Sequence, residues 1–388
     1  WRTARDPKEK KFEEYYRRYR CIEDAADKTR PSERSTIKMP ATKQAIDSAY
    51  DHIMQSIFGP DPFFDIQGRQ NVDKIPAEIF KEYLRCLFFK ENFARKTGFS
   101  IKELLIYGTC VGRVAVDTAR ETRVILEDQT EDEGYLDDLG ELQERQIITG
   151  QNAIMEYHDV NRPEYQPVSV MNFFPDPMAA DCCSGEGVFV RAFPSIQKLR
   201  AMARHGVIDG KGVKLLEKEG APSSTDRDAF KRQLAMTGIQ VEQEDWDKNP
   251  MTLEYWGWLE KDELKAAGYK EEIEDGGAEV SAIISGGSTT LKLIGNPFVT
   301  RKRPFMKSCY EEIPDEFWGM GIPEATEGPA RALDATIRSR LDNKALSVNT
   351  MWAINTRRMI PGQNLSLYPG KTWLTNGPVR EAIEQFKV

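Results

Sequence analysis

The sequence lacks the features that mark several large classes of protein. No apolar run approaches the roughly 18 residues that a membrane-spanning helix needs, so no membrane span is expected. The six cysteines are scattered and form no C-x-x-C pair, which favours reduced thiols over a disulfide framework. The formal net charge is −8, which argues against a conventional DNA-binding domain with a basic face.

Signatures of catalysis and of bound cofactors are missing as well. The three histidines, His52, His158 and His205, stand in no metal-ligand spacing. There is no G-x-S-x-G motif, and the P-G-K-T run at 369–372 is no phosphate-binding loop, because Leu365 stands where that loop needs glycine. We therefore expect no catalytic residue, no metal, no cofactor and no enzymatic activity.

Length and composition predict a folded chain of mixed structure. At about 150 residues per domain, 388 residues correspond to two or three structural units. Hydrophobic residues make up 40% of the chain, which is ample material for a core. Helix-like and strand-like patterns both occur, so we expect an α+β fold.

Apolar residues at helical spacing predict helices in the first third of the chain. One helix is predicted between Ala45 and Phe58. A second is predicted over 76–97, ending at Thr97-Gly98, and helical character continues over 101–108. The second helix has an apolar stripe that we expect to be buried, formed by Ile79, Phe80, Tyr83, Leu84, Leu87 and Phe88.

The ends of the chain allow fewer conclusions. The charged run Tyr15-Tyr16-Arg17-Arg18-Tyr19-Arg20 is either part of an exposed helix or part of an arm on a neighbouring molecule. The sequence begins at Trp1 without a methionine, and residues 378–383 read as the start of a helix. We therefore expect the natural chain to continue at both ends.

Residues 127–144 carry nine acidic side chains and separate two groups of predicted strands. We expect a solvated hairpin loop here, because the residue spacing of a calcium-binding loop is absent. Alternating or β-branched residues predict strands on both sides of it, at 112–116, 123–126, 145–149, 152–157 and 167–173.

The middle of the chain is predicted to combine a short helix with a β-rich unit. Ser195 is a suitable cap for a helix over 195–206. Residues 250–310 are expected to form a small β-rich unit, with strands at 252–259, 279–284, 289–294 and 304–310.

A long helix and a distinctive segment before it dominate the last third. The helix is predicted to begin near Pro323 or Pro329 and to reach residue 347, so that 329–347 would span about 28 Å. Gly328-Pro329 is either its true start or a kink. Its apolar side repeats every four residues, at Leu333, Ile337 and Leu341.

The segment before this helix reads F-W-G-M-G-I-P-E over 317–324. Its glycines permit backbone angles, or a close approach, that a Cβ atom would forbid, and its proline presets the start of a helix. The alternative is an ordinary strand-to-helix turn in a globular core. We predict a structural elbow that fixes the angle between a β-rich knob and the long helix, formed by Phe317, Trp318, Gly319, Gly321 and Pro323.

The order of these motifs resembles the portal, or head-to-tail connector, proteins of tailed double-stranded DNA bacteriophages, especially the short-tailed type. The resemblance is strongest over 296–356, where the F-W-G-x-G-x-P-E elbow precedes a helix with R-L-D-N and a downstream M-W. The stretches N-F-F-P-D-P-M-A at 172–179 and L-L-I-Y-G-T-C-V-G at 104–112 agree with it. Pro329-Ala330-Arg331 replaces the glutamine that is usual in that helix.

The resemblance implies a portal-like fold with a wing, a stem of two helices, a β-containing clip and a crown that is missing or truncated here. Mapped onto the sequence, it predicts the wing at 1–194, the first stem helix at 195–206, the clip at 207–315, the elbow and second stem helix at 316–347, and the return to the wing with the start of a next helix at 348–388.

It also implies a homo-oligomeric ring of probably twelve subunits at the portal vertex of the virion, assembled in the host cytoplasm. Double-stranded DNA would be packaged and ejected through its channel without sequence specificity. The implied partners are terminase, tail adaptor, capsid and scaffolding proteins, with no membrane. Candidates to face the channel or a neighbouring subunit are Glu324, Arg331, Asp334, Arg338, Arg340, Asp342 and Lys344.

Electrostatics fits such a ring, because subunits of net charge −8 could build an electronegative wall that repels and centres a duplex. Two alternatives stay open. An enzyme of nucleic-acid or nucleotide metabolism with an unrecognised carboxylate site predicts metal-dependent turnover. A non-viral scaffold that shares only the elbow predicts a monomer or dimer.

Overall fold

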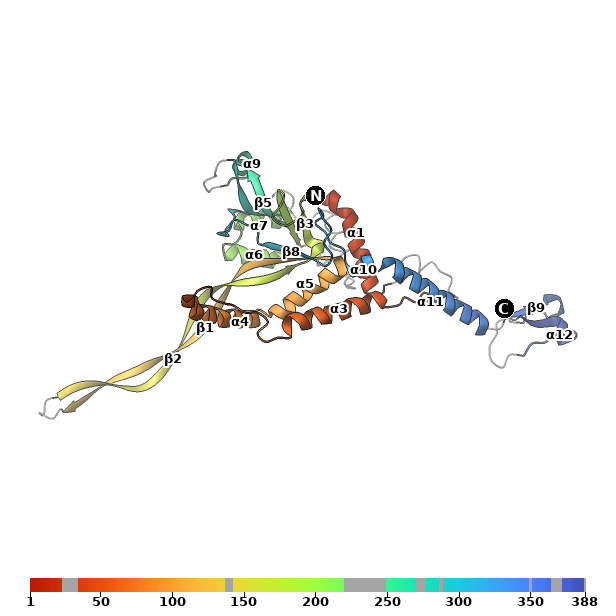
Figure 1. Cartoon of the computed structure of the whole chain (residues 1–388), viewed down its shortest axis with the longest axis horizontal. Helices are drawn as coiled ribbons and strands as arrows, with labels where there is room; N and C mark the ends of the chain where they lie inside the picture. Colours follow the sequence, from red (N-terminus) through yellow and green to blue (C-terminus); the bar gives the residue numbers. More distant parts are fainter. Residues whose placement is uncertain are drawn as a thin grey trace.

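A long β-ribbon and a long helix leave a mixed α+β body in opposite directions (Figure 1). The structure is a computed structural model. It describes residues 1–22, 34–136, 142–219, 249–269, 276–285, 289–348, 351–363 and 372–386.

Helices near the N-terminus form one part of the body. Phe12, Tyr15, Ile46 and Leu105 share a buried core, so α1 packs within its own chain. The run at 15–20 therefore belongs to a partly exposed helix, with Tyr15 buried and Arg17 exposed, rather than to an arm that leaves its own chain. The helices are α1 (Arg2–Tyr19), α3 (Ala41–Phe58), α4 (Lys74–Lys90) and α5 (Phe93–Tyr107), with the short η1 (Asn71–Asp73) before α4.

The boundary between α4 and α5 differs from the predicted one. The break falls at Asn92, which has a left-handed conformation with φ 50°, and α5 continues through Thr97 and Gly98. Gly98 is there for packing, since a Cβ atom at this position would lie 2.7 Å from the hydroxyl of Tyr50 on α3. A glycine that permits close helix packing was thus mistaken for a helix end.

The apolar stripe of α4 is largely exposed, contrary to the prediction. Ile79, Phe80 and Tyr83 are exposed, and Leu87 is buried. Leu84 and Phe88 are half-buried. The other side of α4 packs against an aromatic cluster, and Phe88 lies 5.4 Å from Phe63 and 4.5 Å from Phe93 between ring centroids.

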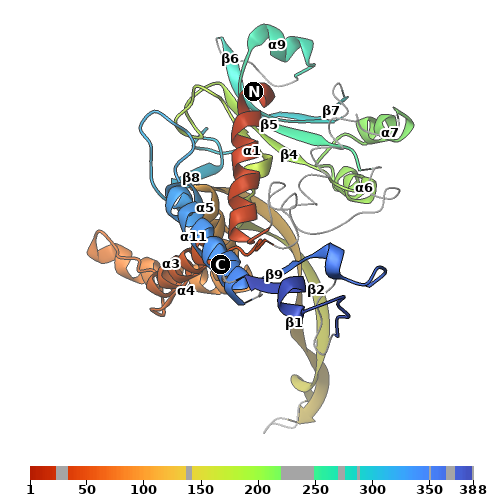
Figure 2. The same cartoon turned by 90° about the vertical axis from the view of Figure 1, so that its right-hand side faces the viewer.

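The first sheet is a ribbon with one additional strand. It has the antiparallel order β2-β1-β8, with β1 (Thr109–Leu136), β2 (Leu142–Val168) and β8 (Phe305–Cys309). β8 pairs only with Thr109–Arg113, so the rest of β1 and β2 forms a two-stranded ribbon that projects from the body (Figure 1, Figure 2). Residues 127–136 and 142–144 are strand rather than the predicted loop, because the ladder continues to the pair Leu136 and Leu142.

The second sheet has five antiparallel strands in the order β3-β4-β5-β6-β7. The predicted strands within 252–294 are confirmed. The sheet also includes β3 and β4, and the strand predicted at 304–310 pairs in the first sheet instead. The strands are β3 (Phe173–Pro175), β4 (Gly187–Ala192), β5 (Thr252–Glu260), β6 (Gly277–Ser285) and β7 (Thr289–Gly295), with η2 (Val170–Asn172) before β3.

This second sheet crosses the boundaries predicted at 194 and 207. β4 precedes residue 194 and pairs directly with β5 beyond residue 207. The helix expected over 195–206 is α6 (Ile196–Arg204), and its Leu199 packs with Leu291 of β7. That helix therefore covers the sheet and forms no rod. Two more helices accompany the sheet, α7 (Gly210–Glu219) and α9 (Lys261–Ala266).

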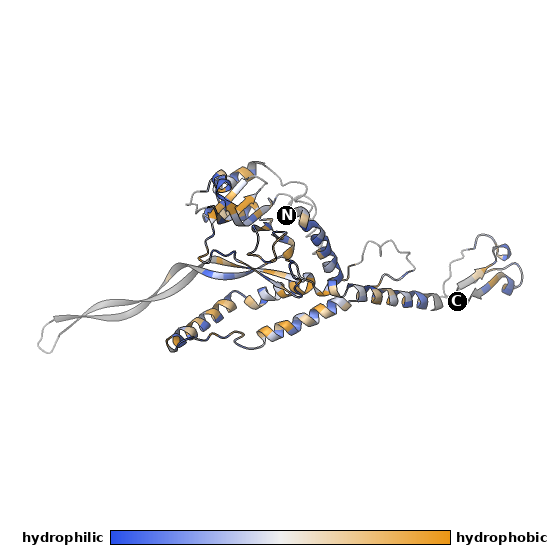
Figure 3. Ribbon diagram, turned by 45° about the horizontal axis from the view of Figure 1, so that its top comes forward, coloured by the Kyte–Doolittle hydropathy of each residue, from blue (hydrophilic) through white to orange (hydrophobic). Residues whose placement is uncertain are grey.

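The long helix agrees closely with its prediction. It is α11 (Glu327–Val348), 22 residues and about 33 Å long, preceded by the single turn α10 (Ile322–Ala325). Because α11 begins at Glu327, Pro329 lies in its first turn and marks a start rather than a kink. Figure 3 shows hydrophobic residues on α3 and α5, and a prevalence of hydrophilic residues along the outer half of α11.

The last residues lie beyond the far end of α11 (Figure 1). The helix expected to start at 378–383 is only one turn, α12 (Val379–Ala382), and the chain then enters β10 (Ile383–Phe386). β10 pairs antiparallel with β9 (Met351–Ile354), and the short η4 (Thr356–Arg358) lies between them in sequence. The return of 348–388 to the wing is therefore not seen within the same chain.

Candidate functional site

The elbow is a place where backbone segments approach very closely. A Cβ atom on Gly321 would lie 2.7 Å from the amide nitrogen of Gly108 and 2.9 Å from the carbonyl oxygen of Ile106. On Gly319 it would lie 2.6 Å from the carbonyl oxygen of Glu311. Only glycine fits at these two positions. Close approach, rather than a left-handed φ, is the reason for glycine here.

Hydrogen bonds hold this approach in place. Gly319 N donates to the buried hydroxyl of Thr109 at 2.8 Å. Met320 N donates to the carbonyl of Glu311 at 3.0 Å, and Tyr310 N donates to the carbonyl of Gly108 at 3.0 Å. Gly108 itself ends α5 in the left-handed region, with φ 83°. The end of α5, the start of β1 and the elbow therefore form one hydrogen-bonded unit.

The two elbow aromatics join separate parts of the core. Phe317 is buried and stacks on Phe173 of β3, with ring centroids 5.8 Å apart. Trp318 meets Phe317 edge-on at 4.8 Å and Phe12 of α1 at 5.3 Å. The orientation of the elbow is therefore coupled to α1 and to the five-stranded sheet.

Arg5 of α1 strengthens the same junction. Its guanidinium lies 4.4 Å from the ring centroid of Trp318. Its Nε donates to the carbonyl of Phe173 at 3.2 Å, and a second nitrogen donates to the carbonyl of Val170. Burial lowers the pKa of Arg5 to about 10. This side chain connects α1, the strand β3 and the elbow through groups that water does not reach.

Pro323 starts α10 and is fully buried. Ala325 N donates to the carbonyl of Gly321 at 3.1 Å, and Ala330 N donates to that of Thr326 at 3.0 Å, so hydrogen bonds continue from the elbow into α11. The elbow is therefore buried, as an ordinary strand-to-helix turn in a core would be. It differs from such a turn because the helix that follows it leaves the body.

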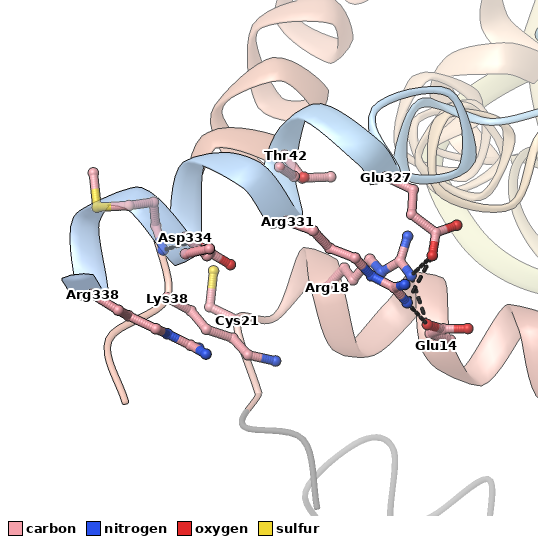
Figure 4. Close-up of a pocket in the computed structure, with 12 residues that line it drawn as sticks. Glu14, Arg18, Cys21, Lys38, Thr42, Glu327, Arg331, Asp334 and Arg338 are labelled. Carbon is pink, nitrogen blue, oxygen red and sulfur yellow. Dashed lines mark hydrogen bonds and ion pairs between the residues drawn. The ribbon is translucent and has the colours of Figure 1, made fainter. Parts of the chain in front are cut away.

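Ion pairs attach the first turn of α11 to α1 (Figure 4). Arg18 lies 2.6 Å from a carboxylate oxygen of Glu14 and 2.6 Å from one of Glu327. Arg331 lies 2.7 Å from Glu327 and 3.1 Å from Glu14. The hydrogen bond from Arg18 holds the pKa of Glu327 below its usual value. Arg331, a predicted channel candidate, is therefore used within the chain at the base of α11, although it is exposed.

The residues 34–39, which we name the strap, lie along α11. Asp334 accepts a hydrogen bond from Met39 N at 2.8 Å, and Asp342 accepts one from Ser35 N at 2.7 Å. Between them, Arg338 Nε donates to the carbonyl of Ile37 at 2.8 Å. Residues four apart share one side of a helix, so this stripe of α11 binds the backbone of the strap.

Three of the candidate channel or inter-subunit residues take part in this arrangement. Asp334, Arg338 and Asp342 were candidates to face a channel or a neighbour, but their polar groups hold the chain's own strap, and Arg338 is buried. Arg340 and Lys344 are exposed on the outer half of α11. Glu324 lies at the base of the helix, with its carboxylate 3.9 Å from Lys11 Nζ.

Most of the net negative charge of the chain lies in a segment remote from α11. Segment 127–145 contains nine acidic residues and one arginine, a net charge of −8 that equals the charge of the whole chain. The described part of this segment is the far end of the ribbon, which projects away from α11 (Figure 1). α11 itself carries four cations and three anions, a net charge of +1. The predicted electronegative wall is therefore not supplied by α11.

Several residues of this site could not be found from sequence. Arg5 binds the carbonyls of Val170 and Phe173, which are 165 and 168 residues away in the sequence. A local sequence pattern cannot predict such long-range contacts. The strap contributes mainly backbone groups, which leave no side-chain signature. Gly108 did carry a signal, because a glycine between a helical and a strand-like segment is typical of a left-handed helix end.

Among the described residues, no group of three or more histidine, cysteine, aspartate or glutamate side chains is arranged to hold a metal ion. The same residues contain no helix that is long and apolar enough to cross a bilayer.

Comparisons with known proteins bear on the whole chain. A search of curated proteins found no match. A comparison with protein families matches residues 2–388 to the family described as Phage SU10 portal protein. The matched range includes the ribbon, the elbow and α11. The chain thus belongs to the Phage SU10 portal protein family, which confirms the resemblance to portal proteins of short-tailed phages.

Proposed function

We propose that the chain is one subunit of a ring at the portal vertex of a phage capsid, with the α11 helices arranged around a channel for double-stranded DNA. Membership of the portal family supports an oligomeric ring and a place at the capsid vertex. The observation that carries the proposal is α11, a helix of about 33 Å that the elbow directs away from the body (Figure 1).

A single copy leaves α11 poorly supported. Most helices in proteins depend on tertiary packing rather than on intrinsic propensity, yet Leu333 and Leu341 on its apolar side are exposed. Burial of such side chains between copies is favourable. Helices that pack side by side around an axis would cover this apolar side in every subunit at once.

We propose a different placement of stem and clip from the one expected from sequence. We assign the stem to α11 and the clip to residues 351–386 at its far end. Residues 207–315, the expected clip, contain β5, whose Trp256 shares a core with Phe305 and with Phe317 of the elbow. The five-stranded sheet is thus part of the body, which we assign to the wing.

We propose that DNA passes without sequence readout. Exposed cations such as Arg340 and Lys344 would make weak, salt-dependent contacts with phosphates, and base recognition would require side chains in a groove. The far end of α11 is the proposed docking place of terminase and tail adaptors. Capsid and scaffolding proteins would contact the body.

Native mass spectrometry and negative-stain imaging test the ring. Twelve copies of 44.2 kDa would give a particle of about 530 kDa with an axial opening. Leu333→Asp combined with Leu341→Asp should reduce ring formation without loss of circular dichroism. Val299→Asp is the matched control, because Val299 is fully exposed outside α11. A wild-type chain that remains a monomer or dimer would contradict the proposal.

A further inference from the structure

One side of α4, together with Val72 of η1 just before it, is an apolar face that the described residues leave uncovered. Val72, Ile75 and Ile79 are 82, 71 and 66% exposed, and Tyr83 is half exposed. These positions recur every three or four residues, so they follow one side of the helix. Cys86, also exposed, continues the same side. We name this surface, Val72, Ile75, Ile79, Tyr83 and Cys86, the α4 face.

The β1–β2 ribbon is the second element that lacks support. Beyond Arg113 it has only two strands, and two-stranded ribbons are marginally stable in water unless something packs on them. Val116 and Met155 are 61 and 63% exposed, and Val114 is exposed as well. Val116 and Met155 lie farther out on the ribbon than Tyr165, which is the ladder partner of Val114 and contacts Ser100 and Phe93 of α5.

The ladder places these apolar residues on one face of the ribbon. Val114 and Val116 are two positions apart on β1, so they share a face. Met155 is the ladder partner of Val124. Val124 follows Val116 by eight residues, an even number, so the two positions belong to the same face of β1. Residues directly opposite in a ladder also share a face. We name Val114, Val116 and Met155 the ribbon face.

We infer that the ribbon face of one copy lies on the α4 face of the next copy in the ring. This inference rests on the proposed function, because it needs a ring. The lengths match approximately, since α4 spans about 25 Å and the ribbon from position 114 to 124 spans about 34 Å. The strongly acidic segment 127–145 begins beyond this contact.

Rotational symmetry supports the same pairing. α4 and the ribbon lie on the same side of the molecule, opposite α11 (Figure 1), so a rotation about an axis along α11 keeps them at the same level. Seen from the α11 side, they leave the body in different directions (Figure 2). The ribbon therefore does not cover α4 of its own chain, but rotation brings it toward α4 of a neighbour. A contact between two different surfaces is the kind that closes rings.

A disulfide test uses the natural Cys86. The double variant Met155→Cys, Cys86→Ser is assembled together with the wild-type chain, and the mixture is mildly oxidised. A disulfide-linked pair of chains should then appear on a non-reducing gel. Peptide mapping should join Cys86 of one copy to position 155 of the other. Val116→Cys provides a second position. Val299→Cys is the control: Val299 is more exposed than either position and lies outside the ribbon, and its variant should give no link to Cys86.

A variant of the α4 face gives an independent measurement. Ile79→Ser should lower the fraction of chain in rings at least tenfold, with unchanged circular dichroism, whereas Val299→Ser should not. If rings form but neither Met155→Cys nor Val116→Cys links to Cys86, the inference is overturned and the proposed ring stands. A link formed within one chain also overturns it. Failure of the wild-type chain to form any ring overturns the proposed function itself.

Discussion

The elbow and the outer half of α11 are close in sequence but are held in different ways. Gly321 approaches the backbone of α5, Gly319 bonds to Thr109 of β1, and Trp318 contacts both α1 and Phe317. The outer half of α11 is mostly exposed, and among the described residues Asp334, Arg338 and Asp342 bind the strap. One chain thus specifies the direction in which α11 leaves the body, and in the proposed ring the neighbouring copies would supply the packing along α11.

Replacing one glycine of the elbow and one glycine of α11 by alanine is expected to give the largest difference between these two regions. Gly321→Ala should destabilise the fold by about 3 kcal/mol, because the new Cβ would overlap the backbone of Gly108 and Ile106. Gly328→Ala, in the first turn of α11 with no atom within 4 Å of its Cβ, should be neutral or stabilise by up to about 1 kcal/mol. Urea denaturation measures both, and similar effects at the two sites would refute the comparison.

Two arginines provide a second, smaller contrast. Arg5→Met should cost about 2 to 3 kcal/mol, because the buried carbonyls of Phe173 and Val170 lose their donors. Arg340→Met, at an exposed position on α11, should change the free energy of unfolding by less than about 0.5 kcal/mol. Thermal denaturation at one pH compares the two variants. An Arg5→Met protein as stable as Arg340→Met would show that Arg5 does not support the elbow.

Glu103 on α5 makes the stability of the body sensitive to pH. Desolvation of its carboxyl raises the pKa to about 7, although Val170 N donates to it at 3.3 Å. The folded protein therefore retains a proton that the unfolded chain loses above pH 4.5, so stability should fall as pH rises from about 4.5 to 7.

Glu103→Gln keeps an acceptor for Val170 N and removes the titration. Its stability relative to wild type should increase by about 2 kcal/mol across that pH interval. Denaturation curves at pH 4.5, 6 and 8 test the sign. A wild-type chain whose stability rises relative to the variant over this interval would disprove the assignment.

A feature could be predicted from sequence when the contacts that determine it are made between residues close together in the chain. The sequence predicts α11 with a start near Pro323 or Pro329 and an end at residue 347, and the helix spans Glu327–Val348, because glycine, proline and a four-residue period act locally. The elbow residues were likewise visible as glycines and a proline between a strand and a helix. The residues that hold the elbow were not, because Arg5 and Gly108 reach it from remote parts of the sequence.

Two errors have a related cause. The stripe of α4 was correctly recognised as apolar, but an apolar pattern does not say which molecule covers it. The acidic segment at 127–144 was taken for a loop, because charge usually indicates solvent exposure. The backbone ladder nevertheless continues through this segment, because the hydrogen bonds of a strand pair do not depend on apolar side chains.

The strap gives the mildest test, because it is the main intramolecular contact of α11 beyond its first turns. Arg338→Met removes the donors to the carbonyls of Ile37 and Thr36 and should weaken strap docking by about 1 kcal/mol. Hydrogen exchange at the amides of Ser35 and Met39 should then become about fivefold faster, while global stability changes little. Arg340→Met, two residues away but exposed, is the matched control and should leave both amides unchanged. Unaltered exchange in Arg338→Met would mean that the strap is held from elsewhere, and that α11 is even less dependent on its own chain than its contacts indicate.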